Sequence, residues 1–117
     1  MNAIIPYEEQ PMRAYRTKPL YVQLLQSEFI KDHFDRYIAE IENLSDTTKN
    51  QRLFFRELLE LPGVIRITIL IGQVVIWRWP GYRWEDIEPG IIRKIESCPI
   101  SQEDLDEQLD MILKKWK

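Results

Sequence analysis

The feature that most constrains the fold is a pair of apolar runs separated by one glycine. Val64 to Leu70 and Gln73 to Trp79 are rich in β-branched and aromatic residues, and Gly72 lies between them. Such runs predict strands, and glycine supplies the positive φ that a tight turn needs. The sequence therefore predicts an antiparallel hairpin over about 64–79.

The type of turn decides which faces of the two strands match. A two-residue type I′ loop would force a positive φ on Ile71, which a β-branched residue resists, so we expect a three-residue loop. A two-residue type II′ loop at Gly72 and Gln73 would exchange the partners. The three-residue loop assigns to the core Ile65, Ile67, Ile69, Val75, Trp77 and Trp79. It leaves on the other face Arg66, Thr68, Val74, Ile76 and Arg78.

Helical spacing of apolar residues recurs on both sides of the hairpin. It predicts helices over 20–43, from Thr48 to a stop at Pro62-Gly63, from Trp84 to Cys98, and over 101–116. Thr48 and Gln51 have the spacing of a capping box, and Ser101 is placed to cap the last helix. The apolar stripe expected to bury the last helix comprises Leu105, Leu109, Ile112, Leu113 and Trp116.

Segregated strands and helices indicate an α+β fold, in which a small antiparallel sheet packs against about four helices. With 117 residues the chain is expected to form a single domain, 1–117. Residues 1–11 hold two prolines around an acidic run and are expected to form a loose N-terminal arm. Residues 12–18 are candidates for a short edge strand.

The composition argues against several classes of function. There is one cysteine, Cys98, and one histidine, His33, and the four glycines fit no phosphate-binding motif. We read Cys98 as a small apolar residue and His33 as solvated or packed, and expect no catalytic, cofactor or metal site. No signal peptide or membrane span is recognisable, so we expect a cytoplasmic protein. The net charge of −3 disfavours a nucleic-acid partner.

The candidate binding site is the segment from Trp77 to Trp84, which has three tryptophans, a tyrosine and two arginines in eight residues. These residue types are enriched in the energetically dominant parts of protein interfaces. If Trp77 and Trp79 point inward, strand alternation points Arg78 outward. The residues predicted to bind a partner are Arg78, Tyr82, Arg83, Trp79 and Trp84.

We therefore predict a non-enzymatic protein-interaction or adaptor module, and a homodimer is also compatible with the sequence. The alternative is a single-stranded nucleic-acid binder, because tryptophan and arginine also suit stacking on bases. In that case Arg13, Tyr15, Arg16 and Lys18 would join the segment 77–84.

Residues 50–95 also carry short motifs of a known family. They comprise Leu61-Pro62-Gly63-Val64 at a helix end, an apolar hairpin, and Trp84-x-x-Ile87-x-Pro89-x-Ile91 opening the next helix. This pattern resembles the N-terminal domain of Nfu/NifU-like iron–sulfur scaffold proteins. The Cys-x-x-Cys motif that holds the cluster belongs to the family's other domain and is absent from this sequence. The resemblance thus implies an interaction role linked to iron–sulfur assembly, without a cluster-binding residue.

Overall fold

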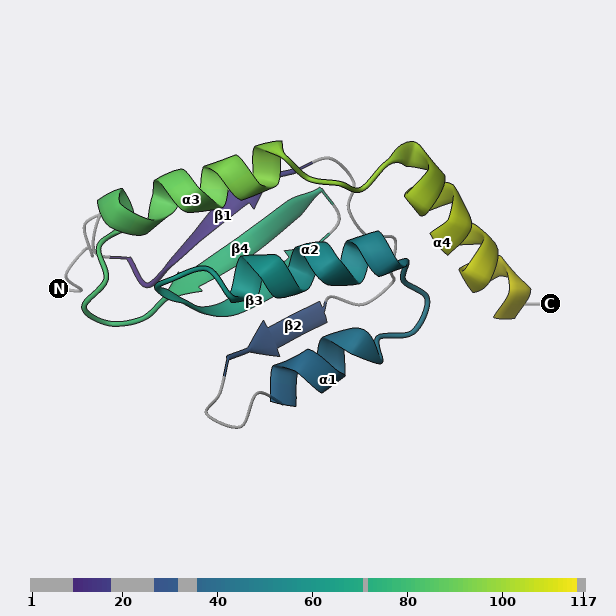
Figure 1. Cartoon of the computed structure of the whole chain (residues 1–117), viewed down its shortest axis with the longest axis horizontal. Helices are drawn as coiled ribbons and strands as arrows, with labels where there is room; N and C mark the ends of the chain where they lie inside the picture. Colours follow the sequence, from purple (N-terminus) through teal and green to yellow (C-terminus); the bar gives the residue numbers. More distant parts are fainter. Residues whose placement is uncertain (1–9, 18–26, 32–35, 71, 116–117) are drawn as a thin grey trace, which may run out of the picture.

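The predicted hairpin forms the centre of a four-stranded antiparallel sheet in the computed structural model, which describes residues 10–17, 27–31, 36–70 and 72–115. The strands are β1 (Met12–Arg16), β2 (Ser27–Ile30), β3 (Val64–Leu70) and β4 (Gln73–Arg78), in the order β1-β4-β3-β2. The helices are α1 (Arg36–Glu42), α2 (Lys49–Leu59), α3 (Trp84–Glu96) and α4 (Gln102–Lys115). The predicted α+β class is confirmed (Figure 1).

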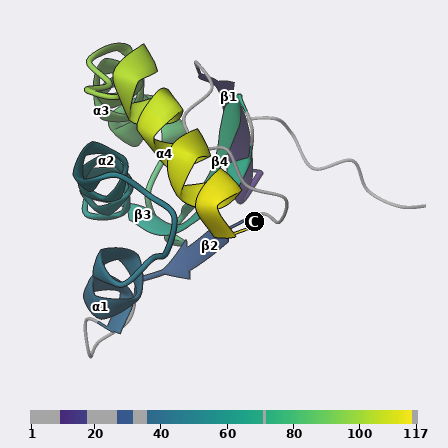
Figure 2. The same ribbon diagram turned by 90° about the vertical axis from the view of Figure 1, so that its right-hand side faces the viewer.

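Three helices, α1, α2 and α3, lie side by side on one face of the sheet, whereas α4 crosses one end of the molecule (Figure 2). The core between sheet and helices is apolar and includes Phe54, Phe55, Leu58, Ile67, Ile76 and Ile91. We call the helix-covered side the inner face and the opposite side the open face.

Local signals place α2 as the sequence predicts. The Thr48 hydroxyl accepts from the Gln51 N–H, and the Gln51 side chain accepts from the Thr48 N–H, which completes the capping box. After α2, Gly63 has a φ of 86°. A Cβ there would lie 2.6 Å from Ile87 Cγ2 and 2.8 Å from Tyr82 Cδ1, so only glycine fits the backbone and the space.

The register of the hairpin differs from the predicted one. Leu70 pairs with Gln73 and Ile67 with Ile76, so a two-residue connection replaces the expected three-residue loop. Val74 and Ile76 are buried on the inner face, and Trp77 lies on the open face, so the predicted burial of Trp77 in the core is wrong. Both faces of β4 carry apolar residues, so alternation could not choose between them, and the turn preference alone gave the wrong choice.

The predicted helix over 20–43 is wrong at residues 27–30, which form β2. Phe29 pairs with Ile67 of β3 and packs on Phe55 of α2, with the ring centroids 6.4 Å apart. This pairing with a distant strand overrides the helical spacing of the local apolar residues. Only the last part of the predicted helix forms, as α1, and residues 18–26 and 32–35 lie outside the described residues.

The predicted edge strand is confirmed as β1, which pairs with β4. Residues 1–9 of the predicted N-terminal arm lie outside the described residues, but its last two residues are held in place. The Pro11 carbonyl accepts from the Arg78 N–H at 3.0 Å, and the Gln10 carbonyl accepts from the Trp84 indole N–H at 2.7 Å. The described end of the arm is therefore part of the folded structure.

The last helix forms where predicted, but it packs on an unexpected side. Ser101 caps α4, since its hydroxyl accepts from the Asp104 N–H at 3.3 Å. The buried α4 residues are polar, Asp104 and Gln108, whereas Leu109 and Leu113 of the predicted stripe are exposed. The Gln51 side chain donates to Gln108 Oε1 at 2.7 Å, and the Asn50 side chain donates to Asp104 Oδ2 at 3.2 Å. Trp116 lies outside the described residues.

Candidate functional site

Arg78, predicted to point outward, lies on the inner face instead. Its Nε donates to the Gln10 carbonyl at 3.2 Å and its Nη1 donates to the Tyr82 carbonyl at 2.9 Å. Its guanidinium also lies 5.9 Å from the centroid of the Trp84 ring. The prediction is wrong because it followed from the incorrect hairpin register. Arg78 joins the chain before β1 to the loop after β4.

Trp84, also predicted to contact a partner, is 1% exposed. Arg13 stacks on the same ring, with its guanidinium carbon 4.8 Å from the centroid. Because Trp84 opens α3 and faces the sheet, its large side chain anchors the helix to the inner face. Its burial leaves no ring surface for a partner in this structure.

The other three predicted residues are exposed where the chain turns from β4 to α3. Trp79 is 37% exposed and Tyr82 is 45% exposed, and the Arg83 side chain forms an ion pair with Glu85 at 2.9 Å. The Tyr82 N–H donates to the Trp79 carbonyl at 3.2 Å, which closes the turn at Gly81. We call Trp79, Tyr82 and Arg83 the loop surface.

The loop surface has a fixed backbone. The Trp79 N–H donates to the Gly63 carbonyl at 2.8 Å, which extends the pairing of β3 and β4 by one further bond. The Tyr82 ring lies against the backbone of Gly63, and Arg78 holds the Tyr82 carbonyl. These contacts hold the backbone of the turn and place the Tyr82 ring before any partner binds.

The open face of the sheet begins next to the loop surface, at Trp77. The Arg66 guanidinium carbon lies 4.5 Å from the Trp77 ring centroid, and Arg66 Nε donates to Glu28 at 2.6 Å. Met12 and Ile30 are exposed on the two outer strands. This face combines exposed apolar groups with an arginine whose charge is paired.

A partly buried polar cluster that was not predicted from the sequence joins β1 to α3. Arg13 is 6% exposed and its Nη1 lies 2.5 Å from Glu88 Oε2, which also accepts from the Tyr15 hydroxyl at 2.7 Å. Burial raises the pKa of Tyr15 well above its ordinary value, and the bond to Glu88 raises it further. Burial also tends to raise the pKa of Glu88, but hydrogen bonds from Tyr15 and Arg13 outweigh it and lower that pKa overall.

Two of the four β1-region residues assigned to nucleic-acid binding belong to this cluster. Arg13 and Tyr15 face the helices, whereas Arg16 is exposed and Lys18 lies outside the described residues. The alternation of β1 was a signal for this arrangement, because Arg13 and Tyr15 share the face opposite Met12 and Ala14.

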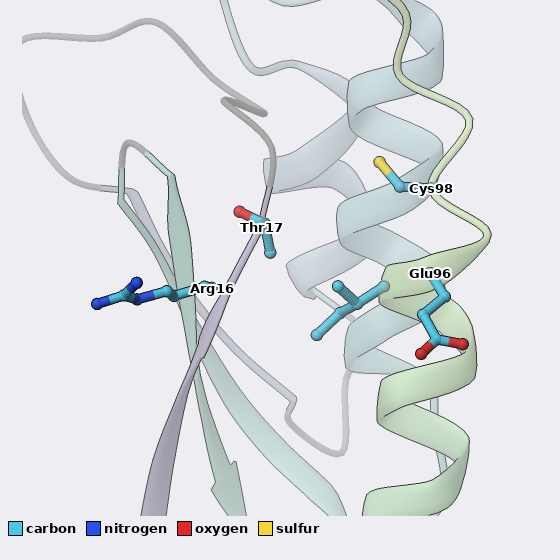
Figure 3. Close-up of a pocket in the computed structure, with 5 residues that line it drawn as sticks. Arg16, Thr17, Glu96 and Cys98 are labelled. Carbon is cyan, nitrogen blue, oxygen red and sulfur yellow. The ribbon is translucent and has the colours of Figure 1, made fainter.

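Cys98 lines a pocket of about 280 Å³ between the end of β1 and the end of α3, together with Arg16, Thr17, Ile95 and Glu96. Figure 3 shows the Cys98 sulfur directed toward the β1 side, while the Arg16 side chain extends away from α3. Cys98 also packs partly buried against the core. The described residues that line the pocket include no histidine to act as a base for the thiol, and His33 itself lies outside the described part of the chain.

Among the described residues, no group of three or more His, Cys, Asp or Glu side chains is placed to hold a metal ion. Within the same part of the chain, no helix has both the length and the apolar character needed to cross a membrane. No family model, curated protein or solved structure matches the chain.

Proposed function

We propose that this chain is a non-enzymatic adaptor module that binds another protein through the loop surface and the neighbouring part of the open face. The observation that supports this most directly is the exposure of Trp79 and Tyr82 on a backbone held by Gly63 and Arg78. Aromatic side chains on a backbone that is held in advance contribute much to affinity, because less conformational freedom is lost on binding.

The charges near this surface favour a protein over a nucleic acid. Arg66 is paired with Glu28 and Arg83 with Glu85. A nucleic-acid surface needs cations that are available to phosphates, and the net charge of the whole chain is −3. The single-stranded nucleic-acid binder remains the second candidate, because Trp77 and Trp79 on a sheet would suit base stacking.

The test is affinity capture from native lysate on the immobilised chain, with and without nuclease. Trp79→Ala combined with Tyr82→Ala should remove the captured protein, since each aromatic anchor typically contributes about 2 kcal/mol. Leu53→Ala is the matched control, because Leu53 is similarly exposed, at 46%, on α2. Capture that survives the double change, or that nuclease abolishes, would contradict the proposal.

A direct titration separates the second candidate. Binding of a fluorescent single-stranded oligonucleotide should be negligible at physiological salt, whereas a true nucleic-acid binder would bind with an affinity that falls steeply as salt rises. The link to iron–sulfur assembly rests on the sequence resemblance alone. Identification of the captured protein by mass spectrometry tests that link, which fails if the protein has no role in iron–sulfur assembly.

A further inference from the structure

A groove of about 360 Å³ lies between the end of α1 and the first two turns of α2. The described residues that line it are Ile41, Glu42, Lys49, Arg52, Leu53 and Arg56. We call it the α1–α2 groove. In Figure 1 the end of α1 and the start of α2 lie toward α4, whereas the β4–α3 connection, which carries the loop surface, lies at the opposite end of the molecule. The groove is therefore separate from the surface assigned to the proposed partner.

Positive charge lines the α2 side of this groove, although the chain as a whole is acidic. Lys49, Arg52 and Arg56 are spaced by three and four positions, so they share one side of the helix. Leu53 lies among them and is 46% exposed. The described lining thus holds three basic side chains and one acidic side chain, in a chain whose net charge is −3.

Two of the three basic charges are not neutralised by a carboxylate. Arg56 is paired with Glu42 across the groove and with a second glutamate at the end of α2, each at 3.0 Å. Arg52 donates from Nη1 to neutral acceptors, the carbonyl of Thr47 at 2.6 Å and its hydroxyl at 3.1 Å. Within the described part of the chain, neither Arg52 nor Lys49 forms an ion pair. These two cations therefore remain available to an anion from outside.

We infer that the α1–α2 groove binds an acidic peptide segment of a partner protein, with an apolar side chain beside its carboxylates. Lys49 and Arg52 are about one helical turn apart and match two carboxylates at a similar spacing. Leu53 offers apolar contact next to them, which a simple inorganic anion would leave uncovered. The described lining contains no aromatic ring on which a base of single-stranded nucleic acid could stack. Charge and apolar contact together thus favour a peptide.

Fluorescence anisotropy with a labelled model peptide tests the inference. The probe is a short peptide with glutamate and leucine at helical spacing, and a second peptide has glutamine in place of every glutamate. The full chain should bind the glutamate peptide, with an affinity that falls as salt rises, and should not bind the glutamine peptide. Lys49→Glu with Arg52→Glu should weaken binding about tenfold or more, because attraction is replaced by repulsion. Leu53→Ala should weaken it several-fold.

Two control variants separate the groove from other causes. Arg93→Glu with Lys114→Glu changes the net charge by the same amount at exposed positions of α3 and α4, and it should bind the peptide normally. Trp79→Ala with Tyr82→Ala should also bind it normally, since the loop surface is not involved. Peptide-induced shifts of backbone amide resonances should fall within residues 41–56.

Several results would overturn the inference. They are no binding of the glutamate peptide, equal binding of the glutamine peptide, an equal loss in the charge-matched control, and amide shifts that fall outside residues 41–56. Lys49→Glu alone keeps the test valid if loss of the bond from Arg52 to Thr47 destabilises the double variant, because Lys49 makes no hydrogen bond or ion pair within the described residues. Binding of an oligonucleotide or of phosphatidylserine vesicles through Lys49, without binding of the peptide, would assign the groove to a different anion.

Discussion

The helices α3 and α4 are both amphipathic, but they are attached to the molecule in opposite ways. The helix α3 buries large apolar side chains, Trp84, Ile87 and Ile91, on the inner face of the sheet. The helix α4 buries Asp104 and Gln108 and leaves two leucines exposed. An apolar stripe in a sequence therefore shows where a helix can bury surface, but not whether its own chain provides the surface that covers it.

The two attachments should differ in the free energy that they contribute to stability. They should also differ in how much of the chain unfolds when one contact is removed. Burial of a large apolar side chain contributes about 1.5–3 kcal/mol, whereas a net hydrogen bond contributes about 0.5–1.5 kcal/mol. Removal of an α3 contact should thus affect the whole domain. Removal of an α4 contact should release mainly the last helix.

The largest effect is expected for Trp84→Ala, which removes the main anchor of α3. The cavity and the lost contacts with Arg13 and Arg78 should lower the free energy of unfolding by about 3–5 kcal/mol. Urea denaturation measures this value, and the exposed Trp79→Ala is the control, expected to cost less than about 1 kcal/mol. Equal effects of the two changes would contradict the assignment of Trp84 as an anchor.

The second-largest effect on stability is expected for the ion pair between Arg13 of β1 and Glu88 of α3. Arg13→Met retains most of the packing volume but leaves the partly buried Glu88 carboxylate without its cation. We expect a loss of roughly 2–3 kcal/mol at neutral pH, below the range for a fully buried pair because the Glu88 side chain is 29% exposed. In the same denaturation assay, Glu88→Gln in the Arg13→Met background should recover part of this loss.

The same pair should make stability depend on acid pH. Folding lowers the pKa of Glu88. The stabilisation of the fold by the Glu88 carboxylate is therefore complete above the unfolded-state pKa of about 4.3, and it is lost as pH falls through the lower pKa of the folded state. The stability difference between the wild type and Glu88→Gln should therefore shrink below about pH 4. Thermal melts across pH 2.5–7 test this, and a constant difference over that range would show that the charge on Glu88 does not matter.

A smaller and more local effect is expected for Gln108→Ala, which removes the hydrogen bond to Gln51. The cost should be about 1–2 kcal/mol. Hydrogen exchange should become faster in α4 while α3 retains its protection. Gln102→Ala, an exposed change on the same helix, is the control. Equal loss of protection in α3 would show that the two helices unfold as one unit.

The smallest effect on stability is expected for Leu113→Asp, since the side chain is 57% exposed. The free energy of unfolding of the monomer should change by less than about 0.5 kcal/mol. Urea denaturation measures this value. A loss above about 1 kcal/mol would remove the contrast between α3 and α4.

The elements that the sequence predicts correctly are those with local physical causes. Thr48 and Gln51 cap α2 through neighbouring atoms, Gly63 ends the turn after it, and Ser101 caps α4. The β-branched runs on both sides of Gly72 form strands for the same reason. Signals of this kind lie within a few residues of the structure that they determine.

The errors concern pairings between distant residues. Phe29 joins a strand because Ile67 is opposite it, and Val74 rather than Trp77 is buried because of the register between β3 and β4. Two residues of the candidate site are placed differently by such long-range contacts. Arg78 lies on the inner face because of the register, and Trp84 is buried between α3 and the sheet, in contact with Arg13 and the Gln10 carbonyl. Tyr82 and Arg83 are exposed as predicted, because Pro80 and Gly81 turn the chain there, whereas Trp79, which the predicted register assigned to the core, is 37% exposed.

The position of β1 has a consequence for how the chain is made. The residues that contact β1 come late in the sequence. Arg13, for example, donates a hydrogen bond to Glu88, which lies 75 positions farther along the chain. At a synthesis rate of about 5–20 residues per second, β1 waits several seconds before β4 and α3 emerge. The β3–β4 hairpin can form as soon as β4 emerges, and the edge of β4 then stays open until β1 pairs with it. We therefore expect β1 to remain unpaired longest during translation, and this delay to be the interval in which wrong strand pairing is most accessible.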